Sequence, residues 1–308
     1  MVDYSKLEEM LKSRNIKKSE LGKALSISSR TIAKIGKGEP ISHIVIEKIC
    51  RHLDCSEDVI ISIIPDNMLL HRLEEEKAGG ISGGIYHEIQ VRMAYNSNHM
   101  EGSRLTEEQT RLIFETNTIG AAEGVRVDDI LETVHHFQAI DYCIDHAKEQ
   151  LTEDFIKELH YILKHDTQDS KLDWFAVGDY KKVGNLAGGA DTAEPYEVEE
   201  KMKKLLADYR LLKKATLEDI VSFHVSFEKI HPFQDGNGRV GRLIAFKECL
   251  KNNIVPFVIE DHKKGFYYRG ISEWTREKGY LMDTCRDGQD QISLLLKKFG
   301  IPFSGNSD

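Results

Sequence analysis

The sequence predicts an all-α protein in two parts, and the spacing of its apolar residues is the main reason. Amphipathic helical segments follow one another along most of the 308 residues, with apolar side chains three or four positions apart. In the longer part we expect helices over residues 107–116, 127–148, 153–163, 197–212, 217–229 and 240–252. Residues 183–195 instead have the pattern of a small β-hairpin, with Gly188 and Gly189 at its tip.

A glycine-rich stretch separates the two parts. Residues 74–84, EEEKAGGISGG, pass from a charged helical end into a run of glycines. Glycine loses the most backbone freedom on folding and weakens helices, so this stretch is the best boundary candidate. We therefore expect a first domain over residues 1–66, a linker over 67–84 and a second domain over 85–308.

Composition narrows the class of protein. Hydrophobic residues make up 40% of the chain and charged residues 30%, as in soluble globular proteins. No apolar stretch is long enough to span a membrane, and the N-terminus lacks a signal peptide's apolar centre, so we expect a cytoplasmic protein. The 5 cysteines are scattered without a CxxC pair, which argues against a zinc ribbon or a thioredoxin-like redox site. The net charge of −9 argues against non-specific coating of nucleic acid.

The first domain has the pattern of several short helices. Ser28 or Ser29 is a suitable N-cap for a helix over 30–35, and glycines end that helix. The segment SELGKALSISSRTIAKIGKGEPIS resembles the helix-turn-helix domains of phage-repressor type. In that family the second helix of the pair enters the major groove of DNA. The resemblance makes Arg30, Thr31 and Lys34 the DNA-binding candidates; the alternative is a domain used only for dimerisation or partner docking.

The chemistry is concentrated in residues 231–242, HPFQDGNGRVGR. A helix ends before the proline, a polar turn follows, and a second helix then begins, whose free N–H groups favour an anion. Arg239 and Arg242 are three residues apart, so both lie on one face and can bind phosphate oxygens. Asp235 would repel phosphate unless a cation joined them, which implies Mg2+. His231, across the turn, can accept a proton from a hydroxyl near neutral pH.

This run resembles the signature of the Fic family, HxFx(D/E)GN(G/K)RxxR, and meets every defined position. The similarity extends from about Tyr86 to the C-terminus and includes residues 252–261 and 266–274. The resemblance implies an all-α core with a β-hairpin flap, here residues 183–195, that aligns a target peptide. It also implies that a Ser, Thr or Tyr hydroxyl of a protein, the chain itself included, attacks the α-phosphate of ATP.

The family's roles carry over onto matching positions. The resemblance implies that His231 is the general base and that Asp235 holds Mg2+, and it assigns ATP phosphate binding to Gly236, Asn237, Gly238, Arg239 and Arg242. Arg242 is expected at the γ-phosphate. Gly238 matches the members that transfer AMP, because phosphate-transferring relatives of the Doc type have lysine there.

A second motif precedes the core. Ser97 and Glu101 are four residues apart and share a face of an expected helix, about 86–102, which Gly102 can end. Residues 97–102 resemble the family's inhibitory motif, (S/T)xxxE(G/N). The resemblance implies an ion pair between Glu101 and Arg242 that keeps Arg242 from the γ-phosphate. In some relatives the same glutamate is thought to serve removal of AMP from a modified protein, so both directions of the reaction stay open.

The sequence thus favours an autoinhibited protein adenylyltransferase that uses ATP and Mg2+. The alternatives are a DNA-binding regulator whose Fic body senses nucleotide, and a de-AMPylating enzyme. Both kinds of domain often pair, so a homodimer is also an expected assembly. The adjacent His135 and His136 point in different directions on a helix and are interpreted as structural rather than metal ligands.

Overall fold

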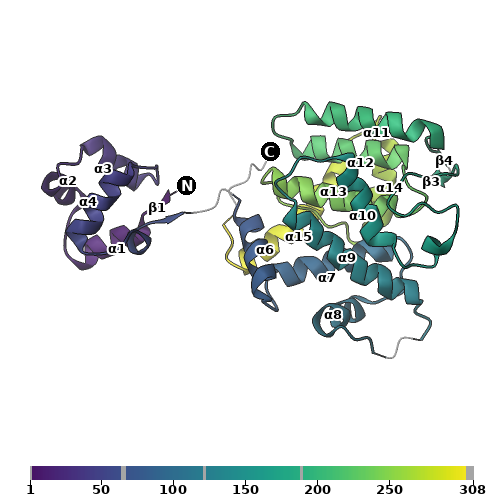
Figure 1. Ribbon diagram of the computed structural model, residues 1–308, viewed down its shortest axis with the longest axis horizontal. Helices are drawn as coiled ribbons and strands as arrows, with labels where there is room; N and C mark the ends of the chain where they lie inside the picture. Colours follow the sequence, from purple (N-terminus) through teal and green to yellow (C-terminus); the bar gives the residue numbers. More distant parts are fainter. Residues whose placement is uncertain (1, 64–66, 121–122, 188–189, 303–308) are drawn as a thin grey trace. The chain divides into compact units, whose positions relative to one another are not determined.

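The computed structural model describes residues 2–63, 67–120, 123–187 and 190–302 (Figure 1). The chain divides into two compact units, Met1–Met68 and Leu69–Asp308. Within the described residues each unit consists of helices and one pair of two-residue strands. The all-α class expected from the sequence is confirmed.

The first unit is a bundle of short helices closed by a strand pair. The helices are α1 (Ser5–Ser13), α2 (Lys18–Ala24), α3 (Ser29–Gly36), α4 (His43–Leu53) and α5 (Glu57–Ile60). Strand β1 (Val2–Asp3) pairs antiparallel with β2 (Ser62–Ile63) and so joins the two ends of this unit.

Apolar side chains from all of these helices fill the centre of this unit. They are Leu7, Leu11, Leu21, Ile35, Ile49, Leu53 and Ile60. Helices α2 and α3 pack closely, since a Cβ added at Gly22 would lie 3.0 Å from Ile32 Cγ1. Helix α3 begins after Ser28, whose side chain accepts a hydrogen bond from Thr31 N. Of the two predicted caps, Ser28 is the one used.

The second unit contains the remaining helices. They are α6 (Met68–Gly79), α7 (Ile85–Met100), α8 (Glu107–Thr116), α9 (Val127–Asp145), α10 (Glu153–Lys164), α11 (Pro195–Arg210), α12 (Leu217–Ile230), α13 (Asn237–Lys251), α14 (Lys264–Glu273) and α15 (Gly279–Lys298). Two 3-10 turns, η1 (Asp169–Lys171) and η2 (Asp261–Lys263), lie between them. Threonines fix several starts: Thr106, Thr152 and Thr216 cap α8, α10 and α12 at the residues where the sequence predicts these helices to begin.

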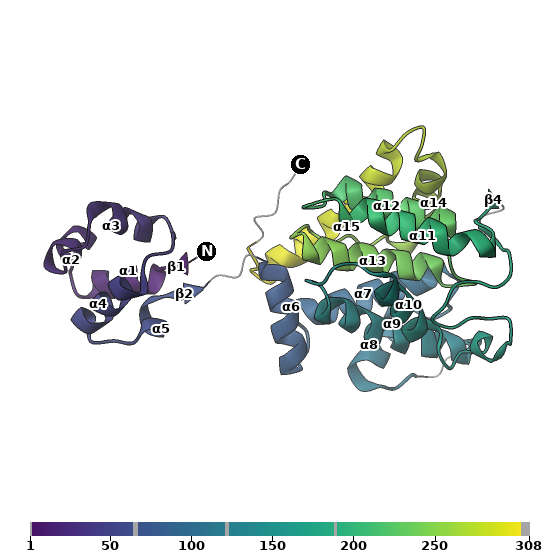
Figure 2. The ribbon, with the colours of Figure 1, turned by 45° about the horizontal axis from the view of Figure 1, so that its top comes forward.

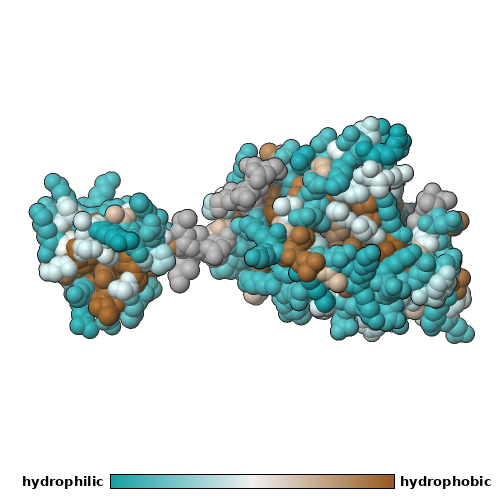
Figure 3. Space-filling view, turned by 90° about the horizontal axis from the view of Figure 1, so that it is seen from above, coloured by the Kyte–Doolittle hydropathy of each residue, from teal (hydrophilic) through white to brown (hydrophobic). Residues whose placement is uncertain are grey.

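Helix α13 is the central element of this unit. It packs against α7, α9, α10 and α12, and Figures 1 and 2 show it surrounded by them. Almost all of its side chains are buried, which explains its lack of an amphipathic pattern. Hydrophilic residues cover most of the face of the second unit that Figure 3 shows. All 5 cysteines are free thiols, and Cys143, Cys249 and Cys285 are buried in this unit.

The expected linker over 67–84 is wrong for most of its length. Residues 68–79 form α6, and Leu69, Leu70 and Leu73 on this helix are buried in the second unit. Their spacing of one and four residues gives a helical apolar face, and its burial outweighs the helix-weakening glycines that follow. Glu76 of α6 also accepts a hydrogen bond from Tyr86 N, 2.9 Å away, in the first turn of α7.

The expected hairpin is present in the described residues as two short strands. Strand β3 (Leu186–Ala187) pairs antiparallel with β4 (Ala190–Asp191), and Leu186 faces Asp191 in the register. The predicted tip, Gly188 and Gly189, lies outside the described residues. No helix in the described part of the chain has both the length and the apolar character needed to cross a membrane.

Candidate active site

The turn between α12 and α13 has a conformation that its sequence dictates. Helix α12 ends at Ile230, and His231 adopts a left-handed conformation with φ 52° before Pro232. Gly236, with φ 79°, is the N-cap of α13, and its positive φ suits glycine. Phe233 is fully buried and stacks on the ring of His160, with the ring centroids 4.0 Å apart. Phe233 therefore anchors the turn in the core.

Asn237 closes this turn with its side chain. Phe233 N donates to Asn237 Oδ1 over 2.8 Å, and Asn237 Nδ2 donates to Phe233 O over 2.9 Å. Asn237 is also buried. The sequence placed Asn237 among the phosphate ligands, but this side chain is already engaged within the loop, so only its backbone N–H is left for an anion.

The start of α13 has the properties of an anion site. Gly236 offers no side chain to cap the helix, so the first backbone N–H groups of α13, from Asn237, Gly238 and Arg239, have no capping acceptor. The helix dipole adds positive potential at this end. Polyphosphate is an anion that matches such a site.

His231 lies across the turn from this helix start. Its Nδ1 is 3.3 Å from Glu228 O, and because a carbonyl only accepts, Nδ1 carries the proton. The neutral ring then has a free lone pair on Nε2. Burial and the nearby positive charge of Lys181 lower the pKa of His231. His231 is therefore neutral near pH 7 and able to accept a proton.

Asp235 belongs to a network of charges. Its Oδ2 is 2.7 Å from Lys164 Nζ and 3.0 Å from Arg239 Nη2. Glu132 contacts the same two cations, at 2.7 Å from Lys164 and 2.6 Å from Arg239. Burial opposes ionisation of Asp235, but Arg239 and Lys164 hold its pKa well below the usual range. The network fixes Asp235 and Arg239 at the start of α13.

The donor set suits Mg2+ held jointly with a phosphate. The described residues contain no cluster of three or more His, Cys, Asp or Glu side chains placed for a metal. However, 49% of the Asp235 side chain is exposed, so this ionised carboxylate keeps an accessible edge. Magnesium ions often bind one or two carboxylates and complete their shell with water and substrate phosphates. Asp235 can supply that single carboxylate.

Arg242, one turn further along α13, is bound by the end of α7. Its Nη2 lies 2.7 Å from Glu101 Oε1, and its Nε donates to Ser97 Oγ over 2.9 Å. Nη2 also donates to Ser97 O over 3.1 Å. Arg242 is 8% exposed, so this ion pair is only weakly screened by water. Glu101 is the residue after the last turn of α7, where its side chain can reach α13.

Gly238 leaves room for this ion pair. A Cβ added there would overlap Glu101 Oε1 and would lie 2.9 Å from Arg242 Nη1. Any larger residue at 238 would therefore have to displace one of the two side chains. The glycine that the sequence links to the transferred group thus also accommodates the contact between Glu101 and Arg242.

These groups surround a pocket of about 860 Å3. Its walls come from the hairpin, the end of α12, the start of α13 and α14, and Glu101 at the end of α7 also lines it. The residues that line it are Glu101, Leu186, Asp191, Thr192, Glu228, Lys229, His231, Gly238, Arg242, Tyr267, Tyr268, Ile271 and Ser272. Its volume is in the range of pockets that bind nucleotide-sized ligands.

The DNA-binding candidates lie on α3 of the first unit. Arg30 is exposed, whereas Thr31 and Lys34 are partly buried. The Thr31 hydroxyl lies 2.9 Å from Ser28 Oγ in the N-cap of the helix. Of the three, Arg30 is the most accessible for a contact with a partner.

Comparison with known proteins matches this architecture. Residues 150–248 match the model of the Fic/DOC family, and residues 6–66 match that of the Cro/C1-type HTH DNA-binding domain. The chain contains a Fic domain. The second unit, in which this match lies, carries the whole signature on one turn and helix.

Relatives of the Fic domain agree in name. The curated protein adenylyltransferase Fic of Aedes aegypti is 26% identical over 226 residues, 72% of this chain and 42% of that protein. The protein of the same name in Drosophila melanogaster is 26% identical over 254 residues, 80% of this chain and 48% of that protein. The chain therefore spans less than half the length of these two relatives.

Solved structures share the fold. A Fic-domain-containing signalling protein from Bacteroides thetaiotaomicron superposes with a TM-score of 0.61 at 22% identity, covering 77% of this chain and 99% of that one. Fic-1 from C. elegans gives a TM-score of 0.57 at 16% identity, covering 96% of this chain and 86% of that one.

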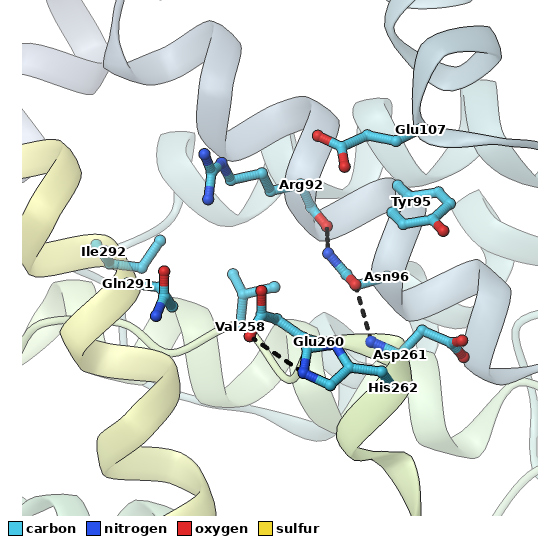
Figure 4. A pocket seen from close by; sticks show the side chains of 10 residues that line it. All are labelled: Arg92, Tyr95, Asn96, Glu107, Val258, Glu260, Asp261, His262, Gln291 and Ile292. Carbon is cyan, nitrogen blue, oxygen red and sulfur yellow. Dashed lines mark hydrogen bonds and ion pairs between the residues drawn. The ribbon is translucent and has the colours of Figure 1, made fainter.

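The second unit holds α7 in place by contacts outside this pocket. Asp261 N donates to Asn96 Oδ1 over 2.9 Å, and His99 Nδ1 lies 3.0 Å from Asp261 Oδ2. Figure 4 shows Asn96 joined to Asp261 in a second, polar pocket of about 270 Å3 between α7, residues 258–262 and α15. These contacts fix the last turn of α7 and therefore the position of Glu101.

The sequence analysis did not identify several charged residues of the site, among them Lys164 and Glu228. Lys164 is buried at the end of α10, in a segment whose pattern is only that of an amphipathic helix. Glu228 precedes His231 by one helical turn and lines the pocket, but it is not part of the signature. A lysine or glutamate in a helix normally faces solvent, so only the fold reveals that these two point inward. His135 and His136 are both buried, and His135 stacks on His165, as expected of structural histidines.

Glu228 is an unusual carboxyl group in this Fic domain. Burial is the main reason that its pKa is raised to about 7; the positive charge of Arg242 opposes this shift and the nearby Glu101 adds to it. Its Oε1 is buried and has no hydrogen-bond partner among the described residues. Ionisation of Glu228 therefore costs stability of the folded state.

The Glu228→Gln variant should be less sensitive to pH than the parent protein. Because the folded-state pKa is raised, Glu228 stabilises the fold while it is protonated, and that stability is lost as the pH rises from about 4.5 through about 7. We expect the difference in unfolding free energy between the variant and the parent to change by about 1–2 kcal/mol between pH 5 and pH 8, with the variant gaining relative stability as the pH rises. Both tryptophans, Trp174 and Trp274, lie in the second unit, so their fluorescence reports its unfolding.

The exposed Glu108→Gln variant is the matched control, and its pH dependence should follow the parent. A Glu228→Gln protein with the same pH dependence as the parent would contradict the raised pKa.

Proposed function

We propose that the Fic domain is a Mg2+-dependent protein adenylyltransferase held inactive by Glu101. The observation that carries the proposal is the shared pocket. His231, Gly238 at the open N-terminus of α13, and Arg242 all line one cavity next to the hairpin. Nucleotidyl transfer to a protein hydroxyl needs a base, an anion site and a surface such as the hairpin that can align a target peptide. The names of the curated relatives support the same reaction.

The proposed reaction is a single displacement at phosphorus. The target hydroxyl oxygen forms a bond to the α-phosphorus of ATP while its proton passes to His231 Nε2. The bond between that phosphorus and the oxygen leading to the β-phosphate breaks, and pyrophosphate leaves. Backbone N–H groups of Gly238 and Arg239 stabilise the charge on the phosphates. Asp235 would hold Mg2+, whose charge would compensate the negative charge of the leaving pyrophosphate.

The proposed inhibition follows from competition for one guanidinium. The γ-phosphate of ATP requires Arg242, and Arg242 is engaged by Glu101 and Ser97. The Glu101 carboxylate also lies in the pocket, where it would repel the triphosphate. Removing this carboxylate should therefore allow ATP to bind productively. De-AMPylation, with Glu101 positioning a water, is the alternative use of the same site.

Intact mass spectrometry tests the reaction. The Glu101→Gly protein, incubated with ATP and Mg2+, should gain the mass of AMP, or transfer it to a protein in an added cell extract. The amount of AMP transferred should be at least about tenfold larger than with the parent protein. The double variant Glu101→Gly/His231→Ala should show no gain, because the base is missing.

Two results would contradict this proposal. A gain equal to phosphate would assign the enzyme to the Doc-like, phosphate-transferring class. Equal rates for the parent and the Glu101→Gly protein would remove the inhibitory role of Glu101.

We propose a second function, sequence-specific DNA binding, for the first unit. The match of residues 6–66 to the Cro/C1-type family supports it, as does the exposed position of Arg30 on α3, the second helix of the expected pair. Recognition helices of this type contact base edges with such side chains. Modification of the chain's own surface could then alter its binding to DNA.

Selection from a random duplex library with the full chain should enrich one sequence. Arg30→Ala should weaken binding to that sequence by about 10-fold or more, since a specific arginine–base contact contributes about 1–3 kcal/mol. Arg51→Ala, at an exposed position on α4, is the matched control and should bind like the parent. If no sequence is enriched at moderate salt, the first unit serves dimerisation or docking instead.

A further inference from the structure

Lys181 is a buried cation that the signature does not include. It lies just before the hairpin and is only 3% exposed. Its Nζ donates to Asn185 Oδ1 and to Thr192 Oγ1, each over 2.7 Å. Among the described residues no carboxylate forms an ion pair with it, although the charge of Glu194 acts on it from a longer distance. A buried ammonium without a counter-ion costs stability, so such a group calls for a functional explanation.

The partners of Lys181 join both sides of the hairpin. Asn185 precedes β3 and Thr192 follows β4, and the Thr192 hydroxyl lies 2.8 Å from Asn185 O. The ammonium thus sits at the base of the hairpin, where the two strands meet. Loss of this cation would remove two of the hydrogen bonds that hold the strands together at this point.

The same base is attached to the loop that carries His231. Lys181 N donates to Pro232 O over 2.9 Å, directly after the histidine. Asn185 Nδ2 donates to Phe233 O over 3.1 Å, and Ala193 N donates to Ile230 O over 3.3 Å. The hairpin and the loop on either side of His231 are therefore held by one set of hydrogen bonds, with Lys181 at its centre.

We propose that Lys181 is a positioning residue of the transfer reaction: its ammonium joins the two sides of the hairpin base, its backbone N–H binds the loop that carries His231, and its positive charge lies next to that loop. The catalytic part of this inference rests on the proposed function. The attachment of the hairpin and the effect on His231 do not, because both are measurable without ATP.

The charges around His231 make this electrostatic role specific. Lys181 disfavours the protonated ring, whereas Asp235 and Glu101 favour it. Glu228 and Lys229 line the same pocket, and Arg242 there is compensated by Glu101. Bound triphosphate would add negative charge and favour the protonated ring further. Lys181 is a buried cation, and Glu194 is the nearby carboxylate whose charge acts on it without forming an ion pair among the described residues. The positive charge of Lys181 therefore opposes this effect.

Titration of His231 by NMR tests the inference. In protein labelled at histidine carbons, the His231 signal is assigned by its absence in His231→Ala. Lys181→Met should raise the pKa of His231 by about 0.5–1 unit, because a nearby positive charge is lost. Hydrogen exchange at residues 185–187 and 191–193 should become faster at the same time. Lys181→Arg should restore both properties towards the parent values.

Two further variants separate the roles. Lys181→Gln can still donate to Thr192 but has no charge, so it should raise the His231 pKa while the hairpin exchanges more slowly than in Lys181→Met; it also serves if Lys181→Met does not fold. Lys182→Met removes an equal charge from the neighbouring exposed position and should leave both readouts unchanged.

In the Glu101→Gly background, the acid limb of the pH–rate profile should move up by the same amount as the His231 pKa. An unchanged His231 pKa in both Lys181→Met and Lys181→Gln would overturn the electrostatic role, even if transfer is observed. A shifted pKa with no transfer in any variant would instead count against the proposed function and leave the role of Lys181 standing.

Discussion

The side chain of Asn237 binds both backbone groups of Phe233, and this closed turn between α12 and α13 is the constraint on which the site depends. The turn places His231 at the end of one helix and opens the N–H groups at the start of the next. Burial of Phe233 against His160 makes the turn part of the core. A loop held in this way keeps base and anion site at a fixed separation, which is how rigid scaffolds lower the entropic cost of a reaction.

The free state of the site balances its cations with protein carboxylates. Asp235 and Glu132 compensate Arg239 and Lys164, and Glu101 compensates Arg242. The pairing of Asp235 and Glu132 with Arg239 and Lys164 ties the turn before α13 to helices α9 and α10. The second pairing comes from α7 and occupies the place that we propose for the γ-phosphate. In the reaction that we propose, only the Glu101 pairing has to be broken for ATP to bind, and we therefore propose it as the point of control.

Much of this site is predictable from sequence, because its chemistry is concentrated in a short run of residues. Glycine, asparagine and proline define the turn locally, and threonine caps mark several helix starts, so these features need no knowledge of the fold. Residues whose role depends on contacts with distant parts of the chain cannot be recognised in this way. Lys164, Lys181 and Glu228 have ordinary helical or loop surroundings in sequence, and their burial arises from packing between elements far apart in the chain. The sequence predicts a linker where α6 forms for a similar reason: the glycines are visible locally, whereas the core that buries Leu73 is not.

For two positions of the signature, the structure adds a structural role to the one that the sequence predicts. Asn237 belongs to the expected phosphate ligands, yet its amide is used to close the turn. Gly238, expected to govern the transferred group, also gives Glu101 and Arg242 the space to meet. Both cases show that one signature position serves local structure and chemistry together.

Calorimetric titration with a non-hydrolysable ATP analogue and Mg2+ tests the central claim, that Glu101 and the nucleotide compete for Arg242. The account predicts that Glu101→Gly and Glu101→Gln bind the analogue at least about tenfold more tightly than the parent, about 1.4 kcal/mol. It also predicts that Arg242→Ala added to Glu101→Gly abolishes this gain. Equal affinity of the parent and both Glu101 variants, or a gain that survives the loss of Arg242, would contradict it.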